Sequence, residues 1–396
     1  MRITHVAYSC FPGNFRGGVP KVVFELAKAQ ACLEHQVFLH TTNINSDVPV
    51  KVPLEEGVRI DGIEIVYHQA RRFPEFCSKA LRRAIVMEAR RCDVLHTHNT
   101  FLSFNRYVRA AATREYRPYF VHPHGALDPA VLKRGLLKSW KKRIYIFLFE
   151  RQNLNQAAGV FALTDLERAQ LLDMGVRAPI HVVSNGVHVR SLPDPSVFRP
   201  KWGIEDQAAI VLYIGRFHEK KGLDLLINAF SRIASQYPAA KLVLGGDRSQ
   251  NPALVQHLDQ IVQEAEITDR VIWTGFLNED AKAEALSAAT IFSHVSQSEG
   301  MAMAILESMA AGLPTIVSDG CYMDKAAREG AVALSQYDAG QLAQTLKELL
   351  EDPGRRDELS RKARAYVAAH HGWEAIAKES IRIYEMSVNR DQERVI

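Results

Sequence analysis

The sequence predicts an α/β protein with two doubly wound domains, each built on a parallel sheet covered by helices on both faces. Short apolar runs alternate with longer stretches of helical periodicity throughout the 396 residues, which is the pattern of parallel strands buried on both faces. The runs fall into two series, and a chain of this length is too long for one compact core. We therefore predict one domain at 1–186 and another at 187–372.

The first domain is predicted from six apolar runs, each long enough for one strand. Helical patterns such as VPKVVFELAKAQACL separate these runs, so the strands are expected to join one parallel sheet. The predicted strands are 3–9, 36–41, 93–98, 119–124, 159–163 and 181–184.

The second domain repeats the pattern after a break at 185–203, where three prolines and no clear periodicity indicate a linker. A last helical pattern at 373–390 follows the second domain, and we expect it to pack back on the first. The predicted strands of the second domain are 209–215, 241–246, 271–276, 290–296 and 314–319.

Motifs at the carboxyl ends of these strands are the candidates for function, because open α/β sheets bind ligands there. FPGNFRGGVP (11–20) follows the first predicted strand, and its Gly17 and Gly18 precede a helix. Exposed amides at a helix N-terminus attract anions. The spacing is not that of the G-x-G-x-x-G dinucleotide fingerprint, and a tight turn without a ligand is the alternative.

A second motif, YIGRFHEKKGLDLL (213–226), also joins a predicted strand to a helix. Arg216 and Lys221 add two cations where the helix N-terminus already carries partial positive charge, which is unfavourable unless an anion joins them. Phosphate fits, since Arg binds it through a bidentate pair and Lys as a point charge. The alternative is a solvated loop in which Glu219 and Asp224 neutralise the cations.

A third motif, SEGMAMAILESMAAGLP (298–314), places Glu299 before a predicted helix and Glu307 in its second turn. The two glutamates lie too far apart for the ~5 Å carboxylate pair of a retaining glycosidase. For each there is a purely structural alternative. Glu299 could stabilise the helix start as an anion, and Glu307 could be an exposed helix residue.

Histidines close two predicted strands, in HTH (96–98) and HPHG (122–125). Residues i and i+2 share a strand face, so each pair could chelate a metal, but the sequence offers no further ligands for a complete shell. We therefore predict no metal site, and no Asp-x-Asp is present to hold Mg²⁺ at a diphosphate. His124 is expected to contact a polar ligand, and His96 and His122 to bond to neighbouring backbone.

The composition excludes several classes of function. A net charge of +4 gives no basic footprint for nucleic acid. Five cysteines without a C-x-x-C pair argue against a disulfide framework or a zinc site and for a reducing compartment. The first residues lack the apolar core of a signal peptide, and no apolar run approaches the ~20 residues that span a bilayer. We expect a cytoplasmic protein.

One segment predicts peripheral contact with a membrane. Residues 138–149 combine KSWKKR with IYIFLF, which is typical of a basic, aromatic helix that lies on an anionic surface such as the inner face of the plasma membrane. The alternative is an ordinary domain helix with a solvated basic face.

The motifs together resemble the retaining GT-B glycosyltransferases of family 4, the group 1 transferases, over nearly the whole chain. The most specific part is G-R-x4-K-G followed by E-x7-E. The matching motifs, in the family's order, are Gly17–Gly18, His124–Gly125, LTDLE (163–167), SNGV (184–187), GRFHEKKG (215–222), GGD (245–247), TGFL (274–277) and E-x7-E (299–307).

The resemblance implies a role for each matching residue. Arg216 and Lys221 would hold the donor diphosphate and stabilise the charge of the leaving group. Glu299 would contact the donor sugar, His124 would contact it near the reacting centre, and Glu307 would accept hydrogen bonds from the ribose. The other implied donor contacts are Gly17 and Gly18 at the diphosphate, the backbone at Phe276 and Leu277 at the base, and the amides of Gly300, Met301, Ala302 and Met303 at the sugar and phosphate.

The implied fold is GT-B, with two Rossmann-like domains facing a central cleft, the first on the acceptor side and the second binding the nucleotide sugar. The implied enzyme is a hexosyltransferase that moves a sugar from a UDP-, GDP- or ADP-sugar to a glycan or lipid-linked acceptor. It would retain anomeric configuration, use no metal or other cofactor and serve polysaccharide biosynthesis. Fixed cations and amide dipoles aimed at the departing diphosphate are the expected catalytic devices.

The sequence departs from the family where Gly-Met-Ala-Met follows Glu299 in place of the more usual Gly-Phe-Gly-Leu, which alters the shape of the sugar pocket more than its chemistry. Two alternatives remain open. One is a GT-B nucleotide-sugar epimerase that needs no acceptor. The other is a catalytically silent nucleotide-binding module.

Overall fold

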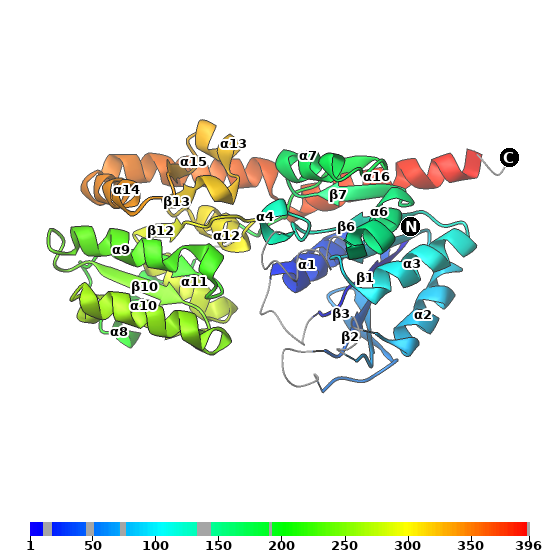
Figure 1. Ribbon diagram of the computed structural model, residues 1–396, viewed down its shortest axis with the longest axis horizontal. Helices are drawn as coiled ribbons and strands as arrows, with labels where there is room; N and C mark the ends of the chain where they lie inside the picture. Colours follow the sequence, from blue (N-terminus) through cyan, green and yellow to red (C-terminus); the bar gives the residue numbers. More distant parts are fainter. Residues whose placement is uncertain (11–17, 45–50, 72–76, 133–143, 190–191, 394–396) are drawn as a thin grey trace. The chain divides into compact units, whose positions relative to one another are not determined.

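The computed structural model describes residues 1–10, 18–44, 51–71, 77–132, 144–189 and 192–393. The chain divides into two units (Figure 1). The first unit is discontinuous in sequence, since it combines Met1–Gly186 with Trp373–Ile396. The second unit is Val187–Gly372.

The described part of the first unit holds an eight-stranded sheet in the order β3-β4-β2-β1-β5-β6-β7-β8. Every neighbouring pair is parallel except the β3–β4 hairpin. The strands are β1 (Arg2–Val6), β2 (Gln36–Thr42), β3 (Gly57–Ile60), β4 (Ile63–His68), β5 (Val94–His98), β6 (Tyr119–His122), β7 (Gly159–Ala162) and β8 (Ile180–Val182).

Helices cover both faces of this sheet. Val6 and Leu95 share an apolar cluster with residues of α2 and α3 on one face, whereas α1 and the chain's last helix, α16, pack against each other on the other. The described helices are α1 (Gly18–Cys32), α2 (Lys79–Ala89), α3 (Ser103–Arg114), α4 (Pro129–Leu132), the π-helix η1 (Ile146–Glu150), α6 (Arg151–Asn155), α7 (Asp165–Asp173) and α16 (Trp373–Glu393).

The second unit holds a six-stranded sheet within the described residues, in the order β11-β10-β9-β12-β13-β14 and parallel throughout. This order reverses direction at β9 and β12, which is where doubly wound sheets bind ligands. The strands are β9 (Ile210–Ile214), β10 (Lys241–Gly245), β11 (Val271–Gly275), β12 (Ile291–His294), β13 (Thr315–Ser318) and β14 (Ala333–Ser335).

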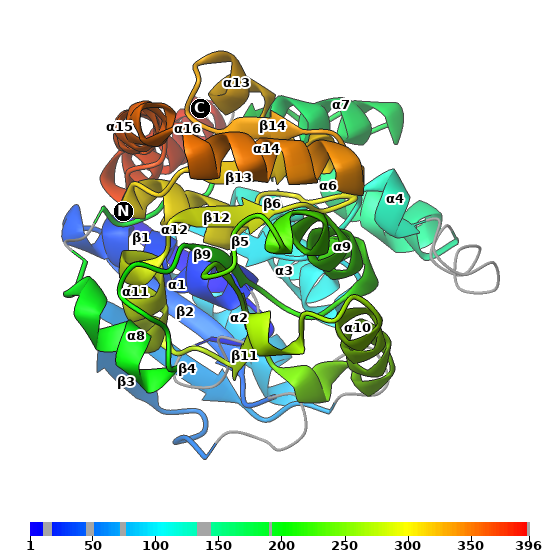
Figure 2. The ribbon, with the colours of Figure 1, turned by 90° about the vertical axis from the view of Figure 1, so that its left-hand side faces the viewer.

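Strand β9 shows why this sheet is buried on both faces. Its Val211 and Tyr213 pack in the cluster of α9, α10 and α14, while Ile210 and Leu212 pack in the cluster of α11, α12 and α15. Figure 2 shows α9 and α10 on one side of the strands and α11 and α12 on the other. The helices are α8 (Phe198–Lys201), α9 (Leu223–Ala234), α10 (Pro252–Glu264), α11 (Glu279–Ala288), α12 (Met303–Ala311), α13 (Asp324–Arg328), α14 (Ala339–Glu351) and α15 (Pro353–His370).

Short 3-10 turns mark several connections of the second unit. They matter for the site because two of them carry polar side chains at the ends of strands. The turns are η2 (Pro195–Val197), η3 (Glu219–Lys221), η4 (Arg248–Gln250), η5 (Thr268–Arg270) and η6 (Asp319–Cys321).

The prediction of an α/β fold with two parallel sheets is confirmed, but three strands were missed. Strands β3 and β4 form a hairpin whose turn, Asp61–Gly62, has positive φ at both residues, and β3 has no fully buried residue. Strand β14 has three residues. The edge strands β3 and β14 are too short to carry a predictive apolar pattern, whereas β4 lies between β3 and β2 and has six residues.

Several predicted strand boundaries were also wrong, including the ends of β8 and β12, which come two residues earlier than predicted. Strand β6 ends at His122 rather than at His124, since Pro123 has no N–H for the ladder and His124 takes a φ of +55°. Strand β1 ends at Val6 rather than at Ser9. Among the described residues, no helix is both long and apolar enough to cross a bilayer.

Candidate functional site

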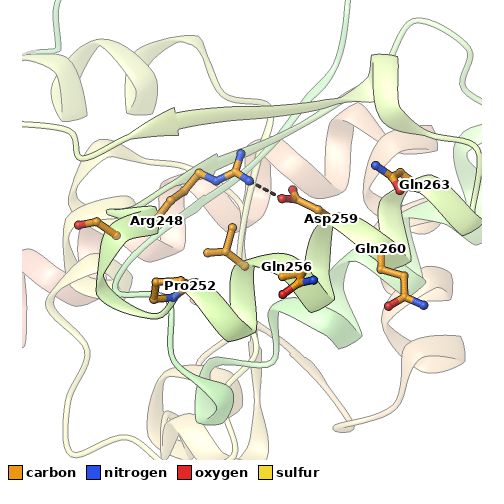
Figure 3. Close-up of a pocket in the computed structure, with 8 residues that line it drawn as sticks. Arg248, Pro252, Gln256, Asp259, Gln260 and Gln263 are labelled. Atoms are coloured by element: carbon orange, nitrogen blue, oxygen red, sulfur yellow. Dashed lines mark hydrogen bonds and ion pairs between the residues drawn. The ribbon is translucent and has the colours of Figure 1, made fainter.

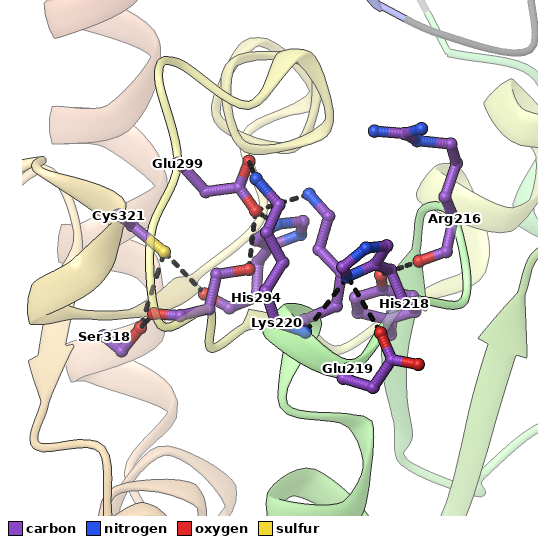
Figure 4. A network of polar contacts seen from close by, with 11 residues as sticks. Arg216, His218, Glu219, Lys220, His294, Glu299, Ser318 and Cys321 are labelled. Atoms are coloured by element: carbon purple, nitrogen blue, oxygen red, sulfur yellow. Dashed lines mark hydrogen bonds and ion pairs between the residues drawn. The ribbon is translucent and has the colours of Figure 1, made fainter. Parts of the chain in front are cut away.

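Glu299 lies at the centre of a buried polar network just beyond the carboxyl end of β12 (Figure 4). The residue is 6% exposed. Its Oε1 accepts hydrogen bonds from Lys221 Nζ and, at 2.6 Å, from Ser296 Oγ. His294 Nε2 lies 3.4 Å from the same oxygen. Within the described residues, Oε2 has only Lys220 Nζ nearby, at 3.9 Å.

The electrostatics of the network favour an ionised Glu299. Burial alone would raise the pKa of Glu299, but the hydrogen bond from His294 and the charge of Lys221 outweigh it and hold the pKa well below its ordinary value. Burial and the charge of Lys221 lower the pKa of His294. Neutral His294 therefore donates its Nε2 proton to the carboxylate.

Lys221 reaches this network because the next residue, Gly222, allows its loop to lie close to the loop after β12. Gly222 has a φ of +60°, and a Cβ there would lie 2.2 Å from the backbone oxygen of Val295, so only glycine allows the two loops to approach this closely. The backbone N–H of Gln297 donates to the oxygen of Lys220 at 2.8 Å and joins the loops. Lys221 is 8% exposed, so the solvated-loop alternative is wrong for this residue.

Arg216 lies just after β9, and its side chain is exposed, whereas that of Lys221 is buried. Its backbone oxygen accepts a hydrogen bond from Tyr213 Oη at 3.1 Å. Its side chain is exposed and extends beside the network (Figure 4). Among the described residues the guanidinium has no hydrogen bond or ion pair, so its five N–H donors remain free for a ligand.

Helix α12 begins at Met303 with Ala302 as its N-cap, and no side chain caps it. Glu299 therefore does not cap this helix with a hydrogen bond, although its negative charge lies before the helix start. Gly300, Met301 and Ala302 are half-buried and lead into the helix. The first amides of α12 thus remain available for an anion or a hydroxyl group.

Glu307 is not the exposed helix residue of the alternative interpretation, because its side chain is 12% exposed. Its Oε1 accepts a hydrogen bond from Lys282 Nζ of α11 at 2.8 Å. Phe276, after β11, is 58% exposed, while its neighbour Leu277 packs partly on the core. These residues all belong to the carboxyl edge of the second sheet.

A surface pocket of the second unit lies along α10 (Figure 3). Its ion pair joins Arg248 to Asp259 at 2.5 Å, and the Arg248 guanidinium lies 4.7 Å from the centre of the Trp273 ring. The pocket contains none of the predicted site residues. It is lined by Arg248, Ser249, Pro252, Val255, Gln256, Asp259, Gln260 and Gln263.

His124 belongs to the first unit, at the carboxyl end of β6. Its ring stacks on His122 at 3.7 Å between centroids, and its Nε2 lies 3.0 Å from His98 Nδ1. Burial lowers the pKa of His124 to about 3, so the ring is neutral. Of the predicted diphosphate glycines, Gly18 begins α1, and Gly17 lies outside the described residues.

The prediction that His96 and His122 bond to backbone was wrong. His96 Nδ1 lies 2.6 Å from the hydroxyl of Tyr384. Neither ring nitrogen of His122 has a hydrogen-bond partner among the described residues. The sequence could not indicate this, because Tyr384 comes from α16, far along the chain.

In the described part of the chain, two trios of histidines bring their ring nitrogens within 4.8 Å of one another. One is His5 with His96 and His98, and the other is His98 with His122 and His124. They could hold a metal only by giving up the hydrogen bonds that join His5, His98 and His124. Neither trio includes a carboxylate to offset the charge of a buried cation. The geometry therefore favours a row of neutral, hydrogen-bonded rings.

Glu167 explains the LTDLE motif. Its carboxylate accepts hydrogen bonds from the backbone N–H groups of Gly125 and Leu163, each at 2.7 Å. Its own N–H donates to Thr164 Oγ1, the N-cap of α7. The motif thus holds the turn that carries His124 and was not predicted to do so, although its T-x-x-E spacing is that of a capping box.

Other residues of the site were also missed. His294 and Ser296 lie two positions apart at the end of a predicted strand, and this spacing could have indicated that both face Glu299. Lys282 lies on an ordinary helical face and gave no signal.

Two family models match the chain. "Glycosyl transferases group 1" matches residues 196–366, and "Glycosyl transferase 4-like domain" matches residues 17–186. Among curated proteins, D-inositol 3-phosphate glycosyltransferase of Frankia alni is 26% identical over 94% of this chain and 95% of its own. The enzyme of the same name from Kineococcus radiotolerans is 24% identical over 94% of this chain and 91% of its own.

Solved structures share the fold. Sucrose-phosphate synthase from Thermosynechococcus elongatus has a TM-score of 0.78 at 21% identity, covering 98% of this chain and 99% of that one. Anabaena HepE in complex with UDP and glucose has a TM-score of 0.77 at 18% identity, covering 98% of this chain and all (100%) of that one.

Proposed function

The chain belongs to the group 1 glycosyltransferases, family 4 of the GT-B fold, and on that premise we propose the details of its reaction. It is an enzyme of the hexosyltransferase type that takes its sugar from a nucleotide sugar. We propose that it transfers the sugar with retention of configuration and without a metal. We further propose that the acceptor is a glycan or a lipid-linked glycan in polysaccharide biosynthesis.

The observation that carries the proposed site is the asymmetry of the Glu299 carboxylate. Lys221, Ser296 and His294 all bond to Oε1. In the described residues Oε2 has only Lys220 nearby, at 3.9 Å. An ionised carboxylate can accept further hydrogen bonds, so Oε2 is the atom that would accept from a hydroxyl of the donor sugar.

Next to this carboxylate, cations and amides would bind the diphosphate. Arg216 has an exposed guanidinium, which suits bidentate contact with phosphate oxygens. The uncapped start of α12 offers amide N–H groups. As the bond to the sugar breaks, negative charge grows on the leaving nucleoside diphosphate, and fixed positive groups stabilise it. A metal is not needed for this neutralisation.

Glu307 would accept hydrogen bonds from the ribose, as the family motif suggests. In the structure it is paired with Lys282, which would hold the carboxylate in place. The backbone at Phe276 and Leu277 would contact the base. In the first unit, His124 would contact the donor sugar.

The exposed apolar residues before α6 support peripheral membrane contact. Ile144, Phe147 and Leu148 are 46%, 66% and 47% exposed, and the basic half of this segment, 138–143, lies outside the described residues. Co-sedimentation with vesicles tests the contact, and we expect binding to anionic vesicles that the Phe147→Ser variant weakens. Equal binding of both proteins, or none by either, would contradict it.

A thermal-shift panel of UDP-, GDP- and ADP-sugars tests the donor site, because a ligand that binds the native state raises its stability. We expect one nucleotide class to raise the melting temperature, and a chelator to leave the shift unchanged. Loss of every shift on chelation would contradict a metal-free site. Product stereochemistry by NMR tests retention. Release of an epimerised nucleotide sugar from donor alone would favour the epimerase instead.

A further inference from the structure

Two buried histidines and one half-buried histidine of the first unit form one continuous row of hydrogen bonds that begins at Gln30 of α1. Gln30 Oε1 lies 2.7 Å from His5 Nε2. His5 Nδ1 lies 2.9 Å from His98 Nε2, and His98 Nδ1 lies 3.0 Å from His124 Nε2. We call Gln30, His5, His98 and His124 the histidine row. Its other end, His124 Nδ1, has no partner among the described residues.

All three rings of the row are neutral. Burial lowers the pKa of His5 to about 4 and that of His124 to about 3, and burial together with its histidine neighbours lowers the pKa of His98 well below the ordinary value. A neutral imidazole has one N–H and one lone pair. Each contact between two rings shares one proton, so all protons of the row point the same way. Only two arrangements of the row satisfy every contact.

Gln30 determines which of the two arrangements forms, because Ser380 fixes the orientation of its amide group. Its Nε2 donates to Ser380 Oγ at 2.9 Å. Ser380 Oγ in turn donates to the backbone oxygen of Ala377 at 2.7 Å, so its lone pairs face Gln30. The carbonyl of Gln30 must then face His5, and His5 Nε2 carries a proton.

The remaining protons follow from this one. His5 Nδ1 is left with a lone pair and accepts from the Nε2–H of His98. His98 Nδ1 likewise accepts from the Nε2–H of His124. The Nδ1 atom of His124 is therefore unprotonated at the open end of the row.

We propose that Gln30, acting through His5 and His98, fixes the tautomer of His124 so that its Nδ1 accepts a hydrogen bond from a hydroxyl group of the donor sugar. This proposal rests on the function proposed above, which places His124 at the sugar. Gln30, His5 and His98 are positioning residues. The row does not conduct protons, because the amide of Gln30 cannot take one up.

The backbone supports the same orientation of His124. Its φ of +55° is unusual for a residue with a side chain, and the carboxylate of Glu167 holds the next N–H, that of Gly125. The turn thus fixes where the ring lies, and the row fixes which of its nitrogens carries the proton. Together they select a ligand group that donates at this point, and they reject one that can only accept.

Nitrogen-15 NMR of the full chain labelled in histidine tests the row without any ligand. In the wild type we expect His124 Nε2 to be protonated and Nδ1 to be bare. Gln30→Met removes the oxygen that accepts the hydrogen bond from His5 Nε2. A buried N–H group without an acceptor costs more free energy than a lone pair without a donor. All protons of the row should therefore reverse, and His124 should change to the Nδ1–H tautomer. Gln30→Glu keeps an acceptor for His5 and should keep the wild-type tautomer.

The opposite tautomer in the wild type, or the same tautomer in Gln30→Met, would overturn the proposal. If Gln30→Met does not fold, Ser380→Ala provides a second variant, since it removes the group that orients the amide. We expect it to mix the two tautomers of His124.

Kinetics distinguish this role from a merely structural one. With the nucleotide sugar selected by the thermal-shift panel, we expect Gln30→Met to lower kcat/KM about tenfold, the effect of losing one hydrogen bond and leaving its partner unpaired. The loss should disappear with the mono-deoxy donor that lacks the contacted hydroxyl. An equal loss with every deoxy donor would overturn the proposal. If no nucleotide sugar binds, the proposed function fails, while the NMR result on the row stands by itself.

Discussion

The two units of this chain share one architecture but treat buried charge in opposite ways. At the carboxyl edge of the second sheet, burial is accompanied by an ion pair, since Glu299 bonds to Lys221 and remains ionised. At the same edge of the first sheet, burial keeps the histidines neutral. His5 of β1 bonds to His98 of β5, and His98 bonds to His124, which follows β6. A buried polar cluster can therefore be stabilised either by opposite charge or by a consistent set of uncharged hydrogen bonds.

The difference suits the tasks proposed for the two edges. A departing diphosphate is an anion, and a site with lysine and arginine lowers its energy. A sugar hydroxyl is neutral, and a neutral ring with a defined lone pair recognises it by direction rather than by charge. The following experiments test how far the two edges really differ.

The largest effect is expected from Lys221→Ala, which leaves Glu299 buried without its closest cation. We expect nucleotide-sugar turnover to fall by at least ~10²-fold and the free energy of unfolding to fall by about 3–5 kcal/mol. The matched control is Lys220→Ala, since Lys220 is the neighbouring lysine but lies 3.9 Å from Glu299. Its cost should stay below ~1 kcal/mol. Equal effects of the two variants, by kinetics and chemical denaturation, would contradict the buried pair.

Mild acid should destabilise the first unit. Burial lowers the pKa of His5, His40 and His68, each to about 4, so the unfolded chain binds more protons than the folded one between pH 6.5 and about 4. Stability is then lost as the pH falls below 6.5, by about 1.4 kcal/mol per pH unit for each group. Hydrogen exchange of β2 and β5 at pH 6.5 and pH 5, corrected for the intrinsic rate, measures this loss.

The second unit provides the comparison for the acid experiment. Its Glu299 has a pKa held well below the ordinary value, so the stability that Glu299 contributes is present above the ordinary carboxyl pKa and is lost only at lower pH. His294 has a lowered pKa and adds one group of the destabilising kind. We therefore expect β9 and β12 to lose less protection than β5. Equal losses in both units would show that the neutral histidines do not set the acid response.

A smaller effect is expected from Gly222→Ala. The added Cβ would meet the backbone oxygen of Val295 at 2.2 Å in addition to the strain of a positive φ, which should cost about 2–4 kcal/mol. Gly203→Ala is the control, since Gly203 has a φ of +62° with nothing within 4 Å of the added Cβ. Its cost should be about 1–2 kcal/mol. Denaturation of both variants gives the difference, and no difference would mean that the two loops do not approach closely.

The smallest effect is expected from Glu167→Gln in the first unit. One of its two backbone N–H partners, at Gly125 and Leu163, would then face an amide N–H₂ group, at a cost of about 1–3 kcal/mol. Asp165→Asn makes the same chemical change at an exposed position in the same helical turn and should cost at most ~1 kcal/mol. A thermal shift of the same size for both would contradict the role of Glu167 in holding the turn.

The two units also differ in how much of them could be predicted. The placement of Lys221 and Glu299 near each other could be predicted, because both lie in short motifs that follow predicted strands. The partners Ser296 and His294 lie within a few residues of Glu299, but they precede its motif and belong to the end of the predicted strand before it. Lys282 was missed because nothing local distinguishes it from any exposed helical lysine.

The first site was predicted only at His124. Its row depends on Gln30 and Ser380, which are 350 positions apart, and no local periodicity connects them. The fold class could be predicted from the alternation of apolar runs with helical patterns, because that alternation is repeated many times along the chain. The edge strands β3 and β14 are too short to repeat any pattern, and only pairing with a neighbour makes them strands.

The discontinuity of the first unit has a consequence for synthesis. Helix α16, which supplies Ser380 and Tyr384 to the buried face of the first sheet, follows the whole of the second unit in the chain. At a usual translation rate, roughly 10 to 40 seconds separate the last strand of the first unit from its closing helix. During that interval His96 Nδ1 and Gln30 Nε2 lack the partners that α16 supplies. The second unit can fold on the ribosome first, and the first unit is completed last although its sequence begins the chain.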